Sequence, residues 1–214
     1  MGLSTVLYFS LLIAILVVGF AQRRILKSTD KVVIILIFLT LISELLGIFA
    51  AYVWKNNLFV YHFYNPLEFI LITIYFTRNT KILKRRIIYR LLCIVGLIFT
   101  TFNSIFMQPI FEMNTYFLLY EGAVIIIFCL LSLQEILLDE LNLPYQFLHF
   151  WLTALFLLYW SVTFTGWGIY CELTPDEFIL NPIFSKILKF SNYGFYIGIL
   201  LTFGMYKKFK VTDA

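Results

Sequence analysis

The chain has 214 residues, of which 62% are hydrophobic, 20% are aromatic and only 13% are charged, and its formal net charge is +4. Soluble domains contain about 25% charged residues, so this chain has too little polar surface to cover a water-soluble globule. The composition therefore excludes a soluble enzyme, a disordered chain and a nucleic-acid-binding domain, and it predicts an integral membrane protein.

Seven apolar segments account for most of the chain. A helix needs about 20 apolar residues to cross the hydrocarbon core of a bilayer. The segments of this kind lie near residues 3–21, 32–54, 57–77, 87–107, 113–134, 145–170 and 180–206. The connections between them are too short to fold separately. We therefore expect an all-α fold in which residues 1–214 form a single seven-helix transmembrane domain.

The Lys and Arg residues between these segments indicate how the chain crosses the membrane. Thirteen of them follow the first, third and seventh segments, whereas Lys55 alone lies in the opposite connections. Under the positive-inside rule, this distribution places the N-terminus outside and the C-terminus in the cytoplasm. The expected location is the inner (cytoplasmic) membrane of the cell, with multiple passes through the lipid bilayer. The basic connection after the third segment is a candidate surface for a cytoplasmic protein partner.

The sequence lacks the groupings that metal binding and intramembrane catalysis require. It contains no H-E-x-x-H or G-x-S-x-G motif, and Cys93, Cys129 and Cys171 form no C-x-x-C pair. Its two histidines, His62 and His149, fall on opposite sides of the membrane in the predicted topology. We therefore expect no metal, no cofactor and no nucleic-acid partner.

Ionisable side chains inside the predicted spans are the strongest functional signal. Each costs about 2.5–3.5 kcal/mol at the bilayer centre on insertion scales, so such residues normally face a bundle interior or a cavity. A structural ion pair would account for two charges, whereas the spans contain three carboxylates, two lysines and a histidine. We therefore predict an outward-facing polar pocket for a small molecule or a lipid. Its candidate residues are Glu44, His62, Asn65, Glu68, Asn103, Glu121, Trp160, Lys186, Lys189 and Asn192.

Helical spacing gives five of the segments a small or polar face that can point into the bundle. Residues three or four positions apart share a face. Small and polar residues also mediate helix packing in membranes, which is the alternative explanation for each of them. The faces are Thr40, Glu44, Gly47 and Ala51; Tyr61, Asn65 and Glu68; Cys93, Gly96, Thr100 and Asn103; Trp160, Thr163 and Trp167; and Ser185, Lys189, Asn192 and Tyr196.

The second and third segments carry a resemblance to known proteins. The stretch from Ser43-Glu44 through Asn56-Asn57 to Tyr64-Asn65-Pro66-Leu67-Glu68-Phe69 resembles small, uncharacterised seven-helix proteins that are common in Bacteroidota. The resemblance implies a seven-helix membrane fold. It implies no activity and assigns no functional residue.

Three functions are compatible with this pattern. The first is a sensor or receptor-like module that binds a ligand in the pocket and signals through the basic connection after the third segment. The second is a transporter, in which the carboxylates handle protons or cations while Lys189 and Asn192 hold an anionic group. The third is a lipid-modifying enzyme that uses Glu68 and His62 as acid and base. The missing catalytic motifs favour the first two.

Overall fold

The computed structural model describes residues 3–84, 86–138, 143–172 and 182–209, and this part of the chain contains helices and no strands. Its long helices are α1 (Leu3–Ala21), α2 (Ser28–Trp54), α3 (Leu58–Asn79), α4 (Arg86–Phe102), α5 (Thr115–Leu137), α6 (Leu148–Glu172) and α8 (Pro182–Gly204). A π-helical turn, η2 (Asn103–Met107), continues α4. The short 3-10 helices are η1 (Lys81–Leu83), η3 (Pro144–Gln146) and η4 (Tyr206–Lys208). The prediction of an all-α chain with seven long helices is confirmed for the described residues.

Five of the described helices are long and apolar enough to cross a membrane, namely α1, α2, α4 with its π turn, α5 and α6. Helices α3 and α8 have similar lengths but are not among these five. Helix α3 contains Asn65 and Glu68, and α8 contains Lys186 and Lys189, so both are less apolar. In a bilayer, these two helices would depend on packing against their neighbours.

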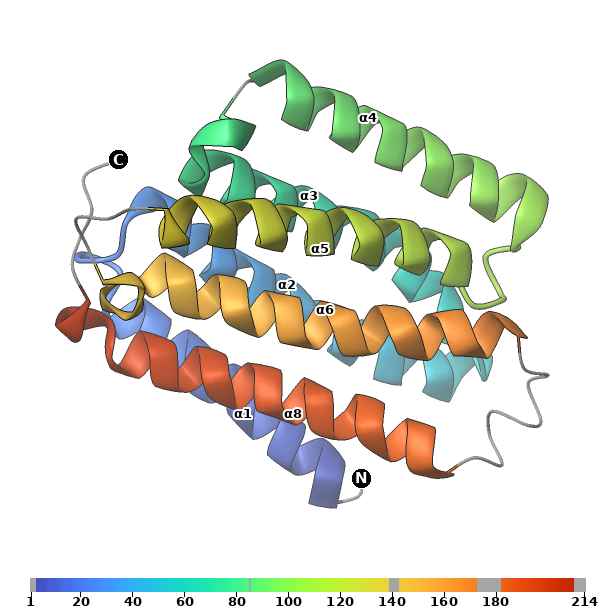
Figure 1. The fold of residues 1–214 in the computed structure, drawn as a ribbon. Helices are drawn as coiled ribbons and strands as arrows, with labels where there is room; N and C mark the ends of the chain where they lie inside the picture. Colours follow the sequence, from blue (N-terminus) through green and yellow to red (C-terminus); the bar gives the residue numbers. More distant parts are fainter. Residues whose placement is uncertain (1–2, 85, 139–142, 173–181, 210–214) are drawn as a thin grey trace.

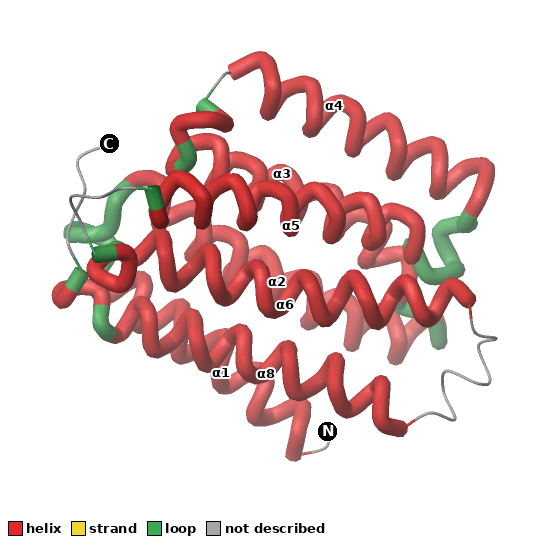
Figure 2. The backbone as a smooth tube through the Cα atoms, in the orientation of Figure 1, coloured by secondary structure: helices red, strands yellow, loops and turns green. Residues whose placement is uncertain are grey.

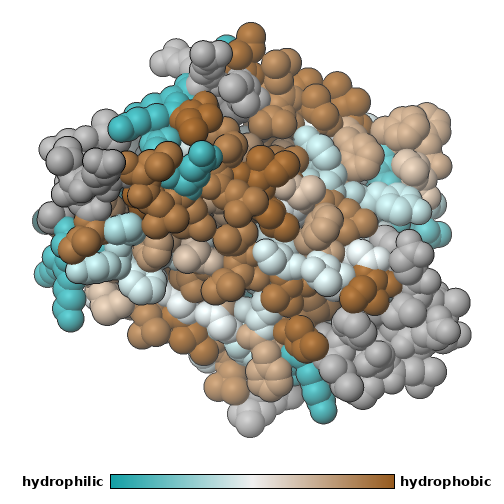
Figure 3. All heavy atoms as spheres, viewed as in Figure 1, coloured by the Kyte–Doolittle hydropathy of each residue, from teal (hydrophilic) through white to brown (hydrophobic). Residues whose placement is uncertain are grey.

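The outer surface of the bundle is apolar. Large hydrophobic side chains such as Val17, Ile98 and Leu158 are exposed on the outsides of α1, α4 and α6. Figure 3 shows one such face, on which hydrophobic residues dominate over α4 and α5. A surface of this kind is unfavourable in water and is typical of a protein embedded in lipid.

Six of the helices form a closed ring. Each packs against the next in the order α1, α2, α3, α5, α6 and α8, and α8 packs against α1 (Figure 1). Helix α4 lies outside this ring, against α3 and α5 (Figure 2). Gly96 allows α4 to approach α3 closely, because a Cβ atom at this position would lie 2.8 Å from Cε1 of Phe69.

The ring is solid in one half and hollow in the other. The half near the α1–α2 and α3–α4 connections is filled by a hydrophobic core that includes Tyr75, Phe76, Phe128, Phe156 and Phe203. Towards the opposite end, where α1 begins and α2 connects to α3, polar side chains replace this core. The core therefore forms the floor of a cavity.

Polar contacts hold the basic connections to the solid end. The Tyr206 hydroxyl donates a hydrogen bond to the Asp30 carboxyl (3.1 Å) and accepts one from the backbone N–H of Lys27 (3.1 Å). Burial raises the pKa of Tyr206 to about 12, so this hydroxyl keeps its proton at neutral pH. In the α3–α4 connection, the Glu135 carboxylate accepts a hydrogen bond from the backbone N–H of Lys81 (2.7 Å).

Candidate functional site

The hollow half of the ring contains a cavity of about 410 Å³. This volume lies within the range of about 300–1,000 Å³ that is usual for small-molecule sites. All the ring helices contribute to its wall. The described residues that line it are Tyr8, Thr40, Glu44, Asn57, Leu58, Tyr61, Tyr64, Asn65, Glu68, Met113, Asn114, Leu118, Tyr159, Trp160, Thr163, Trp167, Asn192 and Tyr196.

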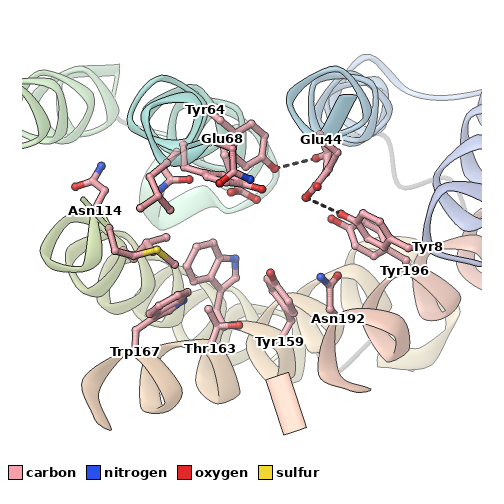
Figure 4. A pocket seen from close by; sticks show the side chains of 18 residues that line it. Tyr8, Glu44, Tyr64, Glu68, Asn114, Tyr159, Thr163, Trp167, Asn192 and Tyr196 are labelled. Atoms are coloured by element: carbon pink, nitrogen blue, oxygen red, sulfur yellow. Dashed lines mark hydrogen bonds between the residues drawn. The ribbon is translucent and has the colours of Figure 1, made fainter. Parts of the chain in front are cut away.

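Two carboxyl groups face this cavity from adjacent helices. Glu44 on α2 accepts a hydrogen bond from the Tyr8 hydroxyl at 3.4 Å, and Glu68 on α3 lies beside Tyr64 (Figure 4). The Tyr64 and Thr40 hydroxyls share a hydrogen bond of 2.9 Å, which joins α3 to α2 beside the carboxyl groups. The acidic side of the cavity is thus held by a short polar network.

A third carboxyl group, that of Glu121, is buried next to this network. Glu121 lies one helical turn beyond Leu118 on α5, on the helix face that looks into the ring. Its side chain is fully buried, both carboxyl oxygens have no hydrogen-bond partner, and it lies within electrostatic range of Glu68. Three glutamates from α2, α3 and α5 are therefore brought together, although they are far apart in the sequence.

The opposite wall of the cavity is aromatic. Trp160 and Trp167 extend from α6 at a spacing of seven residues, and Tyr159 adds a phenol ring from the same helix, whereas Tyr196 on α8 packs on Tyr8 beside Glu44. The Tyr159 ring is fixed by stacking on Phe195, with ring centroids 4.5 Å apart. Aromatic faces of this kind can stack on a flat ligand or contact a cation.

A smaller cavity of about 250 Å³ lies beside the first one, between α1, α2 and α8. Lys189 lines this side cavity, together with Ser4 and Tyr193. The two cavities share Tyr8, Glu44 and Asn192. Lys189 is thus placed near the acidic network but outside the main cavity.

The structure brings most of the predicted site residues to these cavities. Glu44, Asn65, Glu68, Trp160 and Asn192 line the main cavity, as the sequence analysis proposes. Glu121 lies one turn deeper on its helix, and Lys189 lines the side cavity.

Three predicted residues lie elsewhere and require a correction. Lys186 is exposed on α8 and is not among the residues that line either cavity. Asn103 begins the π turn η2, which continues α4 outside the ring, and its side-chain amide donates hydrogen bonds to Asn114 (2.6 Å) and Gln108 (3.1 Å). It therefore shapes the α4–α5 connection instead of the cavity wall.

His62 also has a structural position. Its Nε2 atom lies 3.0 Å from the backbone carbonyl of Glu112, and its Nδ1 atom lies 2.7 Å from the hydroxyl of Ser104. Because a carbonyl can only accept, Nε2 carries the proton and Nδ1 accepts from Ser104. The third hypothesis requires His62 and Glu68 to act together as acid and base. His62 does not line the cavity with Glu68, so this pair is not assembled there.

The contacts of His62 lead to a stability prediction. We expect His62→Leu to lower the free energy of unfolding by roughly 1–3 kcal/mol, because the buried His62 ring makes hydrogen bonds to the Glu112 carbonyl and the Ser104 hydroxyl that leucine cannot make. Thermal unfolding in lipid nanodiscs measures this change. Ser104→Ala, which removes only one of the two hydrogen bonds, should cause a smaller loss. An unchanged melting temperature for His62→Leu would contradict the structural role.

Several lining residues were missed by sequence reasoning. Tyr8, Tyr64 and Tyr159 contribute hydroxyl groups to the cavity, and Asn57 and Asn114 lie at the helix ends near its outer part. Tyrosine is counted among the hydrophobic residues of the composition, so Tyr8 was not recognised as a polar residue of α1. The spacing of Ser4 and Tyr8, four residues apart, is the pattern that marks the inward face of α1.

The described residues contain no group of three or more His, Cys, Asp and Glu side chains that could hold a metal ion. The cavity instead offers carboxyl, amide and hydroxyl groups on one side and aromatic rings on the other, which suits the binding of an organic molecule. Comparison of the chain with protein-family models, curated proteins and solved structures found no match.

Proposed function

We propose that the protein is an integral membrane receptor or sensor that binds a small molecule in the main cavity. One observation carries this proposal: six helices close into a ring around a polar cavity, while the opposite half of the ring is packed solid. A cavity with a packed floor retains its ligand at one side of the membrane. In the proposed orientation, the N-terminus and the hollow half face outwards.

The distribution of basic residues supports this orientation. Arg23 and Arg24 in the α1–α2 connection, Arg78 in the last turn of α3 and Lys81 in η1 lie at the solid end of the bundle, as does the short helix η4. By the positive-inside rule, this end faces the cytoplasm. The hollow end would then be open to a ligand from outside or from the outer part of the bilayer.

Helix α3 offers a direct route for a signal. It contributes Asn65 and Glu68 to the cavity and continues to the basic α3–α4 connection, where Glu135 holds the backbone of Lys81. A ligand that moves or rigidifies α3 would therefore change the position of this basic surface. A cytoplasmic partner would read out that change.

Native mass spectrometry of the protein in mild detergent tests whether the cavity holds a ligand. A Leu118→Trp variant fills part of the cavity, and the control Leu130→Trp adds the same ring on the exposed face of the same helix. We expect a co-purified small molecule in the wild type and in the control, and its loss in Leu118→Trp. Bulk lipid alone in the wild type, or a bound molecule that survives in Leu118→Trp, would contradict the proposal.

A proton-coupled transporter is the second candidate, and Glu121 favours it. A buried carboxyl group beside a second one is an arrangement that proton relays use in transporters. Flux measurements in liposomes with an imposed pH gradient separate the two functions. A transporter requires pH-driven flux of the bound molecule that Glu68→Gln abolishes, whereas a receptor binds the molecule without moving it.

A further inference from the structure

We infer that the ligand of the main cavity is a small organic cation with a hydrogen-bonding oxygen, bound by Glu68 against the aromatic wall. The inference rests on the proposed function, because it names the class of molecule that the cavity holds. It follows from the charges, the ring surfaces and the unpartnered polar atoms of the described residues.

The charges of the cavity wall are all of one sign. Glu44 and Glu68 face the cavity, and none of the described residues that line it is Lys, Arg or His. An ionised carboxylate in a membrane interior is costly unless a cation accompanies it. A cationic ligand supplies the charge that the protein wall does not.

Glu68 is better placed than Glu44 for this role. Each of the two carboxyl groups has a tyrosine beside it, Tyr8 for Glu44 and Tyr64 for Glu68. Glu44 also lines the side cavity with Lys189, so a protein cation lies on its other side. Glu68 lines the main cavity only, and its ionisable neighbour on α5 is the buried Glu121, which adds further negative potential when ionised. The strongest attraction for a cation is therefore expected at Glu68.

The aromatic wall fits an ammonium group. Trp167 and Tyr159 stand across the cavity from Glu68 (Figure 4), and Trp160 lines the cavity from the same helix. Rings of this kind attract a cation over their faces, and recognition of quaternary ammonium groups uses such walls. A metal ion is a poorer occupant, since a cavity of about 410 Å³ lined by rings is far larger than the oxygen shell that a small ion requires.

Unpartnered polar atoms indicate what else the ligand carries. Asn114 lines the cavity and is 2% exposed, and its side-chain N–H₂ group has no hydrogen-bond partner because only its oxygen is used by Asn103. A buried donor without a partner is unfavourable, and a ligand oxygen that reaches the Asn114 amide would supply the missing acceptor. On α8, the Asn192 side-chain oxygen is also buried without a partner and can accept from an N–H or O–H group.

The test uses pairs of probes that differ only in charge. Choline is matched by the neutral 3,3-dimethylbutan-1-ol, in which carbon replaces the ammonium nitrogen, and tyramine is matched by the neutral 4-propylphenol, in which a methyl group replaces the ammonium group. Each probe is titrated at up to millimolar concentration into the protein in nanodiscs. Tryptophan fluorescence reports binding, because two of the four tryptophans line the cavity.

We expect at least one cation to bind and its neutral partner to bind much more weakly. Glu68→Gln should lower the affinity for the cation by roughly ten- to hundredfold, as expected for the loss of a charged hydrogen-bond partner. The matched variant Glu112→Gln removes a carboxylate that is exposed at the same end of the bundle, and it should leave the affinity unchanged.

The outcomes distinguish a failure of the cationic-ligand inference from a failure of the proposed binding function. Equal binding of a cation and its neutral partner, abolished by Leu118→Trp, would overturn the cationic ligand and leave the proposed binding function intact. Cation binding that survives in both Glu68→Gln and Leu118→Trp would show that the cation binds elsewhere and would overturn the inference. No binding of either cation would also overturn it, and the mass spectrometry described above would then decide on the proposed function.

Discussion

Replacement of Glu121 by leucine is expected to make the protein more stable. The Glu121 carboxyl group is fully buried and both of its oxygens lack hydrogen-bond partners. A buried polar group without partners lowers the free energy of unfolding by about 1–3 kcal/mol, and a leucine of similar size carries no such penalty. For a chain of this length, each kcal/mol shifts the melting temperature by roughly 2–4 °C. We therefore expect Glu121→Leu to melt about 2–10 °C higher than the wild type in nanodiscs.

Two controls make this prediction specific. Glu112→Leu removes an exposed carboxylate and should not raise the melting temperature, because that group is already solvated. Glu121→Gln keeps an uncharged polar group at the same place and should give only part of the gain. A lower melting temperature for Glu121→Leu would mean that the carboxyl group has a stabilising partner in the membrane.

A stabilising Glu121→Leu substitution would bear on function. A residue that lowers stability and has a better local alternative is usually retained for a binding or catalytic role. Glu121 lies beside Glu68, which faces the main cavity. We therefore expect the same substitution to weaken ligand binding or proton coupling at this site.

Much of the fold follows from the lengths of the apolar segments. A segment of about 20 apolar residues can satisfy its backbone in lipid only as a helix, so the number of helices and their approximate ends are set locally. The helices begin and end within a few residues of the predicted limits, for example α5 at Thr115–Leu137 against a predicted 113–134. The membrane orientation depends on charges outside the helices and stays a prediction.

The sequence predicts the cavity-lining residues correctly where helical periodicity alone determines which residues share an inward face. Thr40 and Glu44 on α2, and Asn65 and Glu68 on α3, share helix faces in the sequence, and the structure turns both faces into the cavity. The face of the fourth segment that ends at Asn103 shows the limit of this reasoning. Its spacing is equally good, but periodicity cannot reveal that α4 packs outside the ring.

The remaining differences arise from contacts between distant parts of the chain. His62 lies next to the cavity-facing residue Tyr61, yet it turns towards Ser104 and the backbone of Glu112 in the α4–α5 region. No local pattern predicts these partners. The side cavity depends in the same way on the meeting of α1 with α8, which the order of helices in the sequence does not specify.

The second large effect is expected next to Glu121, at Gly122. This glycine lets α5 pack closely on α6, because a Cβ atom there would lie 3.3 Å from Cβ of Phe164 and 3.3 Å from Cε3 of Trp160. Leucine adds three further carbon atoms in the same space. Overpacking of this kind costs about 1–3 kcal/mol or more, so we expect Gly122→Leu to lower the melting temperature by roughly 5–10 °C.

Gly194 on α8 provides the matched control for Gly122→Leu, since nothing lies within 4 Å of a Cβ atom at that position. Gly194→Leu should leave the melting temperature unchanged or raise it slightly, because glycine in a helix costs about 1 kcal/mol relative to alanine. Gly122→Leu should also displace Trp160, which lines the cavity, and so alter the tryptophan fluorescence and reduce probe binding. Equal losses in the two variants would show that general helix substitution, and not the close contact between α5 and α6, determines the result.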